Sequence, residues 1–205
     1  MRIIAGKYRR RKLQTNPGLT TRPITDRVKV ILFDRLPGVF EDARVADIFA
    51  GTGTMGLEAL SRGAASVVFM ERDHQAHSLL MENVRYLKAE SQALCWRTDA
   101  VRSSFLPKGV PDFLPYEVIF FDPPYRMAEE IRPGVPIYEA LERLAREQVS
   151  SPGAQLIFRC GHGTQMQFPP TWELENQFRV TSMDLYVFRR GTPVSQPEAE
   201  AVQPS

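Results

Sequence analysis

Four consecutive residues in the second half of the chain, Asp122-Pro123-Pro124-Tyr125, combine a carboxylate, a rigid backbone and an aromatic ring. The two prolines fix φ and have no N–H group, so the carbonyl groups around them are held in place. The Asp122 carboxylate and the Pro123 carbonyl could accept hydrogen bonds from an exocyclic amine of a base, while the Tyr125 ring stacks on that base after it is lifted from its helix. This pattern favours methyl transfer to a planar amine, for which positioning matters more than a strong base.

The same four residues have a purely structural interpretation, in which the proline pair ends a strand and the tyrosine covers the core. The apolar run 116–121 before them is typical of a strand buried on both faces. Asp122 would then lie at the carboxyl end of that strand, where open α/β sheets bind their ligands. Candidate ligand residues at three other strand ends favour the chemical interpretation.

These other strand ends could together hold a nucleoside. Gly51, Gly53 and Gly56 follow Asp47 closely, and glycine lets the backbone turn tightly and approach a ligand. Glu71 closes the next strand, twenty positions after Gly51, where it could bind both hydroxyls of a ribose. Asp99-Ala100, after a third strand, could read an adenine edge. The candidate cofactor-binding residues are Asp47, Phe49, Gly51, Gly53, Glu71, Asp99 and Ala100.

The spacing Gly51-x-Gly53-x-x-Gly56, with Glu71 beyond it, also fits the dinucleotide fingerprint. A nicotinamide-dependent oxidoreductase is therefore a second candidate. Asp47 counts against it, because an anion beside the glycines would repel a pyrophosphate but suit the ammonium group of a methionine-type ligand. Hydride transfer would also leave the residues 122–125 without a role. The sequence therefore favours S-adenosyl-L-methionine as the cofactor.

The elements that position these residues alternate between strands and helices, which predicts an α/β fold with a mostly parallel, doubly wound sheet. We expect a basic N-terminal β arm at 1–21, one domain at 22–190 and a disordered tail at 191–205. The expected helices are 55–62, 74–88, 137–148 and one whose N-cap is Thr25 or Asp26. The expected strands are 44–49, 66–71, 93–97, 116–121 and 154–159, followed by an antiparallel pair at 172–180 and 183–190.

Positive charge is concentrated at the N-terminus. Residues 1–35 carry a net charge of +8 and the remainder −6, for a total of +2. Such an arm suggests a polyanionic partner, because each basic side chain that meets a phosphate releases a counterion. A solvated segment that aids solubility is the alternative. The candidate RNA-binding residues are Lys7, Arg9, Arg10, Arg11, Arg22 and Arg27.

Several other classes of protein are disfavoured. The chain has no run of eighteen apolar residues, and its basic N-terminus lacks the apolar stretch of a secretory signal. Cys95 and Cys160 match neither a metal-ligand spacing nor a disulfide framework, and the three histidines are scattered. We therefore expect a cytoplasmic protein, with no metal and no membrane contact, that acts as a monomer.

From Arg2 to Arg190 the chain resembles the bacterial 16S ribosomal RNA guanine-N2 methyltransferases. The resemblance is carried by the segments 2–9, 22–28, 47–63 and 122–125 together, since Asp-Pro-Pro-Tyr alone is shared with DNA adenine methylases. It implies a class I S-adenosylmethionine-dependent methyltransferase fold: a seven-stranded, mostly parallel, Rossmann-like sheet with an antiparallel last strand and a small N-terminal β extension that helps to hold RNA. It also implies Asp47 near the methionine moiety, Glu71 on the ribose and Asp99 near the adenine.

The resemblance further implies that residues 122–125 surround a guanine of ribosomal RNA, either free or in an assembling small ribosomal subunit. The chain departs from the family pattern at Arg10, where a glycine is usual, at Lys29-Val30, where Arg-Glu is usual, and near Arg159, where a glutamate is common. Three alternatives remain open: an N6-adenine or other amine methylase of DNA or RNA, the oxidoreductase, and a nucleic-acid-binding protein that has lost catalysis.

Overall fold

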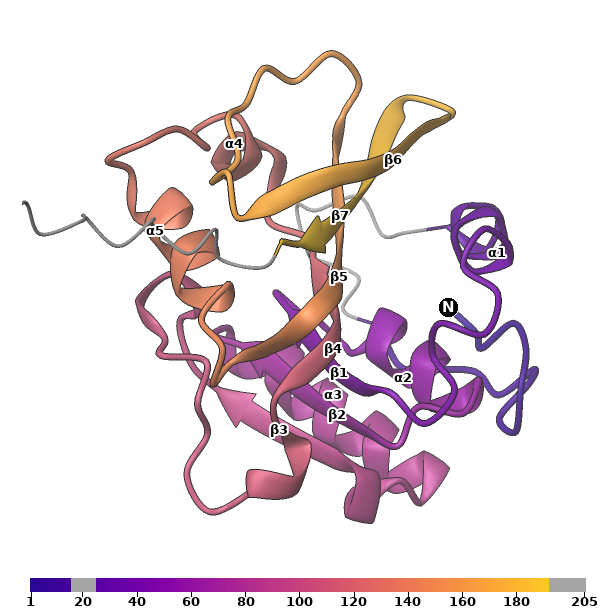
Figure 1. Ribbon diagram of the computed structural model, residues 1–205. Helices are drawn as coiled ribbons and strands as arrows, with labels where there is room; N and C mark the ends of the chain where they lie inside the picture. The colour runs from indigo at the N-terminus through magenta and orange to yellow at the C-terminus, as the bar shows by residue number, and fades with distance from the viewer. Residues whose placement is uncertain (16–24, 192–205) are drawn as a thin grey trace, which may run out of the picture.

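One twisted sheet organises the molecule (Figure 1). The computed structural model describes residues 1–15 and 25–191. Within them, seven strands lie in the order β3-β2-β1-β4-β5-β7-β6. β7 is antiparallel to both of its neighbours, and the other adjacent strands are parallel. The strands are β1 (Arg44–Ile48), β2 (Ser66–Glu71), β3 (Ala93–Arg97), β4 (Tyr116–Phe121), β5 (Ser150–Gly161), β6 (Trp172–Val180) and β7 (Met183–Arg190).

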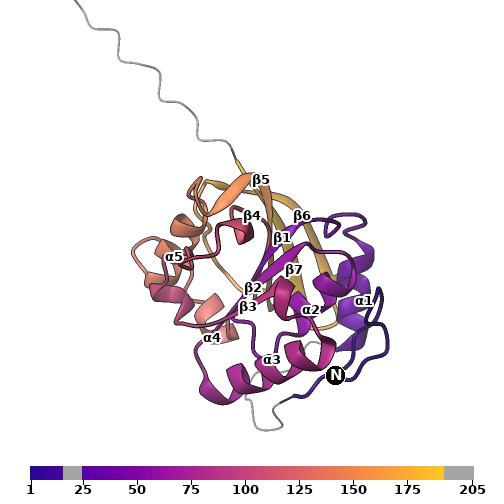
Figure 2. The same ribbon diagram turned by 90° about the horizontal axis from the view of Figure 1, so that it is seen from below.

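Helices cover both faces of the sheet and make three layers. α1, α2 and α3 pack on one face, and α4 and α5 pack on the other (Figures 1 and 2). The predicted α/β fold, with its mostly parallel sheet and antiparallel last strand, is therefore confirmed. The helices are α1 (Asp26–Asp34), α2 (Thr54–Ser61), α3 (His74–Leu87), α4 (Tyr125–Ala128) and α5 (Pro136–Leu144), with short 3-10 turns η1 (Glu90–Gln92), η2 (Ala100–Arg102) and η3 (Pro111–Phe113).

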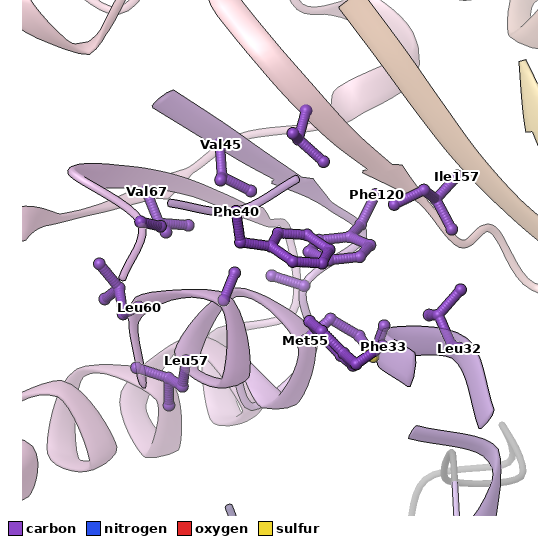
Figure 3. Close-up of a cluster of buried hydrophobic side chains, with 14 of the residues drawn as sticks. Leu32, Phe33, Phe40, Val45, Met55, Leu57, Leu60, Val67, Phe120 and Ile157 are labelled. Atoms are coloured by element: carbon purple, nitrogen blue, oxygen red, sulfur yellow. The ribbon is translucent and has the colours of Figure 1, made fainter. Parts of the chain in front are cut away.

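The core forms on both faces because successive strand residues point to opposite sides of a sheet. In β1, Val45 packs into the cluster under α1–α3, while Ala46 and Ile48 pack under α4 and α5. Figure 3 shows the first cluster, where Phe40 stacks on Phe120 with ring centroids 5.7 Å apart. Burying each such large side chain stabilises the fold by about 1.5–3 kcal/mol. The strand ends are thereby fixed relative to one another.

Element boundaries differ from expectation around α5, which ends at Leu144 rather than at 148, while β5 begins at Ser150 rather than at 154. The Ser150 hydroxyl donates a hydrogen bond to the Leu144 carbonyl at 2.5 Å, and Ser150 pairs with Tyr116 of β4. Pairing with β4 therefore extends the strand toward the helix. α4 was not predicted, because four residues are too few to show helical periodicity.

Residues 1–15 form a hairpin-like arm with a single isolated bridge, between Arg2 and Lys12, rather than regular strands. Ile3 and Leu13 are buried in the core beneath it. The predicted boundary at 21/22, the tail from 192 onward and Arg22 lie outside the described residues. Across residues 1–15 and 25–191, no helix has the length and apolar character needed to cross a membrane.

The arm is fastened to α2 by backbone hydrogen bonds to the buried carboxylate of Glu58. Ile4 N and Ala5 N donate to Glu58 at 2.9 and 3.1 Å, and Lys29 Nζ lies 3.1 Å from the same carboxylate. Lys29 and Glu58 are both inaccessible to solvent, and burial lowers the pKa of Lys29. Lys29 is one of the departures from the family pattern, and its buried side chain serves as an internal anchor for the arm.

Candidate functional site

A cleft of about 630 Å³ opens at the carboxyl ends of the parallel strands. The segments after β1 to β4 line it, as do Met1 and Thr15 of the arm. β1 and β4 are neighbours, and the strand order reverses between them, which is where open α/β sheets bind ligands. The volume is ordinary for a small-molecule site. The predicted residues that line the cleft are Asp47, Phe49, Gly51, Glu71, Ala100, Asp122, Pro123, Pro124 and Tyr125.

Asp47 lies beneath the glycine turn and is 2% exposed. Its Oδ2 accepts a hydrogen bond from Gly56 N at 2.8 Å. Gly53, at the N-cap of α2, has no side chain to cap the helix, so Asp47 satisfies an otherwise unpaired N–H of the first turn. Burial raises the pKa of Asp47 to about 7; the bond from Gly56 opposes the rise, and the charges of Asp122 and Glu71 add to it. A cationic ligand would favour the ionised carboxylate.

Glu71 ends β2 with both carboxylate oxygens held by backbone groups. Oε2 accepts from Gly51 N at 2.8 Å, and Oε1 accepts from Asp73 N at 2.7 Å. Each oxygen keeps lone-pair capacity for another donor, so two adjacent hydroxyls could bind without any movement of the side chain. A Cβ at Gly51, where φ is +56°, would meet no other atom of the described residues within 4 Å, so this glycine faces open space.

Two predicted cofactor residues do not line the cleft. Gly53 has a φ of +83°, and a Cβ there would lie 2.4 Å from Leu80 Cδ1, so this glycine permits close packing on α3. Asp99 caps η2 by accepting from Val101 N at 3.0 Å, while its neighbour Ala100 lines the cleft. The two residues support the walls of the cleft rather than forming its surface.

The residues 122–125 lead from β4 into α4 on the far side of the cleft from Glu71's strand. The Pro124 carbonyl accepts hydrogen bonds from two N–H groups of α4, at 2.8 and 3.1 Å, and is committed to the helix. The Pro123 carbonyl accepts none from the described residues, so it is the one available to a ligand. Tyr125 is 36% exposed, which leaves its ring open for stacking.

Arg159, for which no role was predicted, lies beside Asp122. Its Nε and Nη2 donate to the two Asp122 carboxylate oxygens at 2.8 and 2.6 Å. Burial by itself would lower the pKa of the Arg159 guanidinium, but the Asp122 charge, the hydrogen bonds to Asp122 and the nearby Tyr125 together outweigh burial, and the pKa is raised. In the sequence, Arg159 stands out as the single charged residue within the apolar run 156–160. This run belongs to β5, the strand next to β4.

None of the described basic residues of the arm lines the cleft. Lys7 donates to Gln92 Oε1 at 2.7 Å, close to the start of β3, whereas the arm's ends at Met1 and Thr15 reach the cleft. Arg10 has a φ of +67°, a left-handed conformation that favours the glycine usual in the family pattern. The described members of the predicted RNA-binding set are all exposed: Lys7, Arg9, Arg10, Arg11 and Arg27.

Besides Arg159, two basic side chains that were not predicted line the cleft. Arg72 follows β2, and Arg126 follows the tyrosine of residues 122–125. Arg72 is exposed and lies 3.8 Å from Asp99. In the part of the chain that the structure describes, no group of three or more His, Cys, Asp or Glu side chains could hold a metal ion.

The order of the strands, the antiparallel β7 and the cleft at the switch point define the class I S-adenosylmethionine-dependent methyltransferase fold. A dinucleotide-binding sheet of the Rossmann type has the strand order 3-2-1-4-5-6, with all strands parallel. The inserted antiparallel strand next to β5 distinguishes this protein from that form.

The chain belongs to the family described as "Conserved hypothetical protein 95", whose sequence profile matches residues 1–189. It is 43% identical over 129 residues to the ribosomal RNA small subunit methyltransferase D of Escherichia coli K12. That stretch covers 62% of this chain and 61% of the relative. It is 32% identical over 195 residues to the protein of the same name from Haemophilus influenzae, covering 91% of this chain and 93% of the relative.

A solved structure agrees with this relationship. The yhhF protein of Escherichia coli, described as a methyltransferase, superposes with a TM-score of 0.75 at 32% identity. The match covers 93% of this chain and 98% of that one. The resemblance of the sequence to the ribosomal RNA methyltransferase family is thus confirmed at the level of family and fold.

Proposed function

We propose that this protein transfers a methyl group from S-adenosyl-L-methionine to the exocyclic N2 amine of a guanine in small-subunit ribosomal RNA. The observation that carries the proposal is the position of Asp122, the exposed Tyr125 ring and the Pro123 carbonyl, which has no partner among the described residues, along one wall of the cleft. The names of the Escherichia coli and Haemophilus influenzae relatives support small-subunit ribosomal RNA as the substrate. The guanine N2 atom rests on the family resemblance.

The opposite wall has the groups that the cofactor would need. Asp47 would face the ammonium group of the methionine moiety, and Glu71 would bind the two ribose hydroxyls through its free lone pairs. Gly51 leaves room for the ligand to approach the backbone, and Ala100 borders the adenine end. When bound, S-adenosyl-L-methionine supplies an electrophilic methyl group on a sulfonium sulfur.

The wall formed by residues 122–125 would prepare the amine. An exocyclic amine is a weak nucleophile because its lone pair is delocalised into the ring. Asp122 and the Pro123 carbonyl would each accept one N–H hydrogen bond, which directs the lone pair toward the methyl group. Tyr125 would hold the base by stacking. One C–N bond would form as the C–S bond of the donor breaks, the sulfur would leave as a neutral thioether, and the methylated amine would release one proton to water, directly or through Asp122.

RNA would reach the cleft along a basic surface. Arg72 and Arg126 lie at the cleft, and the arm, whose backbone is bound to α2, adds its exposed arginines. Such contacts to phosphates position a nucleic acid without reading its sequence. The arm thus would contribute affinity, and the cleft would select the base.

The proposal is tested by incubating the purified protein and labelled S-adenosyl-L-methionine with small-subunit ribosomal RNA, with partly assembled subunits, or with DNA. We expect label in the ribosomal RNA, free or assembled, and none in the DNA. Asp122→Asn should lower the transfer rate at least 100-fold with little change in cofactor affinity by calorimetry, because mispositioning costs about that much. Glu139→Gln, an exposed carboxylate on α5, serves as the control. Labelled DNA, or an unaltered rate in Asp122→Asn, would contradict the proposal.

A further inference from the structure

Arg159 is aligned with Asp122 by the register of two neighbouring strands. The last pair of the parallel β4–β5 ladder is Phe121 with Phe158, and Asp122 and Arg159 each follow one position later. The two side chains meet fork to fork, with the guanidinium Nε and Nη2 on separate carboxylate oxygens at 2.8 and 2.6 Å. This geometry fixes the plane of the carboxylate as well as its distance.

The surroundings of the pair do not favour a role in stability alone. The Arg159 side chain is only 11% exposed and that of Asp122 22%, above an apolar floor that includes Leu32, Phe120 and Ile157. Arg159 Nη1 is buried and has no hydrogen-bond partner among the described residues. A buried ion pair seldom stabilises a protein more than apolar side chains of the same size would. A buried polar group without a hydrogen-bond partner also calls for an explanation other than stability.

With both of its oxygens bound by Arg159, the Asp122 carboxylate can bind a substrate in one orientation only. Each carboxylate oxygen has about two acceptor sites, and Arg159 occupies one on each. The remaining sites share the plane that the guanidinium has set. Asp122 therefore cannot rotate freely within the cleft that it lines, and a donor from the cleft meets an acceptor whose direction is already fixed.

We propose that Arg159 is a positioning residue for methyl transfer: it orients the Asp122 carboxylate so that the target amine presents its lone pair to the methyl group. This inference rests on the proposed function. Arg159 acts through Asp122, so it controls the rate of transfer and not the binding of the cofactor. Its contribution also requires the carboxylate of Asp122.

The test measures kcat for methyl transfer to ribosomal RNA and, by calorimetry, the Kd for S-adenosyl-L-methionine. Arg159→Met removes every donor but keeps a similar length, whereas Arg159→Lys keeps the charge but has a single donor nitrogen and cannot form the two-nitrogen fork. We expect kcat to fall about 100-fold in Arg159→Met and about tenfold in Arg159→Lys, with the cofactor Kd changed less than threefold. In an Asp122→Asn background, Arg159→Met should change kcat less than threefold, because a residue that acts through Asp122 has little left to position.

Two results would overturn the inference while leaving the proposed function intact: wild-type kcat in Arg159→Met, or an equal loss of kcat with and without the Asp122 carboxylate. If the wild-type protein transfers no methyl group to RNA, the proposed function fails, and this inference fails with it. If Arg159→Met folds poorly, two other variants still test the inference. Arg159→Lys should lower kcat about tenfold. The double variant Asp122→Asn/Arg159→Met leaves no unpaired buried charge, and its kcat should lie within threefold of that of Asp122→Asn.

Discussion

At the scale of single residues, the ionisation of Asp47 should make both protein stability and ligand binding in the cleft depend on pH. Burial raises the pKa of this carboxyl to about 7, whereas the ordinary value, which applies to the unfolded chain, is 3.8. Between these two pH values the folded protein therefore keeps a proton on Asp47 that the unfolded chain has lost. The contribution of this group to stability is therefore full below about pH 4 and is lost as the pH rises through 7. A cationic ligand should reverse that trend, because it binds the ionised form.

We therefore expect the cofactor to bind more weakly at low pH. If a proton on Asp47 competes with the ammonium group of S-adenosyl-L-methionine, Kd should be roughly tenfold higher at pH 6 than at pH 8. Asp47→Asn keeps the acceptor for Gly56 and removes the charge, so its Kd should be high at both values of pH. Calorimetry on the two proteins measures this. An equal pH dependence in Asp47→Asn would show that another group is responsible.

At the scale of elements, the buried Lys29–Glu58 pair joins the arm, α1 and α2. Glu58→Ala leaves a buried ammonium and two arm N–H groups without their acceptor. We expect it to lower the free energy of unfolding by about 3–5 kcal/mol. Urea denaturation measures this value. Glu139→Ala, which removes an exposed i,i+4 pair with Arg143, should cost less than about 1 kcal/mol. Equal losses in the two variants would contradict the anchoring role of Glu58.

The arm's charge can be tested without removing the arm. Deleting residues 1–15 would also remove Ile3 and Leu13 from the core, so lost RNA binding would have two causes. Arg9→Gln/Arg11→Gln keeps the core, and we expect it to reduce the slope of log affinity against log salt concentration by about 1.5. Fluorescence anisotropy with ribosomal RNA measures the slope. Arg146→Gln/Lys108→Gln, which changes two exposed charges on other segments, should leave it unaltered. If the two variants behave alike, the arm does not bind RNA.

At the scale of the whole molecule, the features that could be predicted from the sequence are those that depend on short segments of the chain. Apolar runs such as 116–121 identify the strands, and the residues just beyond them must meet at one edge of a parallel sheet. This is why Asp47, Glu71 and Asp122, far apart in the chain, could be expected around one cleft. The fold class was predictable for the same reason.

The parts that could not be predicted depend on register and on distant contacts. Arg159 meets Asp122 only because β4 and β5 are adjacent and aligned to the residue, which no single segment reveals. The arm points its turn away from the cleft because Glu58 and Ser61, more than fifty residues later, bind its backbone. A Cβ at Gly6 would lie 1.6 Å from the Ser61 carbonyl oxygen, so this contact also requires a glycine that the sequence alone does not explain.

The central claim is that the cleft methylates the N2 amine of guanine, and the most direct test identifies the modified nucleoside. Small-subunit ribosomal RNA is incubated with the protein and isotopically labelled S-adenosyl-L-methionine, digested to nucleosides and analysed by mass spectrometry. We predict that the labelled methyl group appears on N2-methylguanosine. Label on N6-methyladenosine or on any other base, with none on N2-methylguanosine, would contradict the claim.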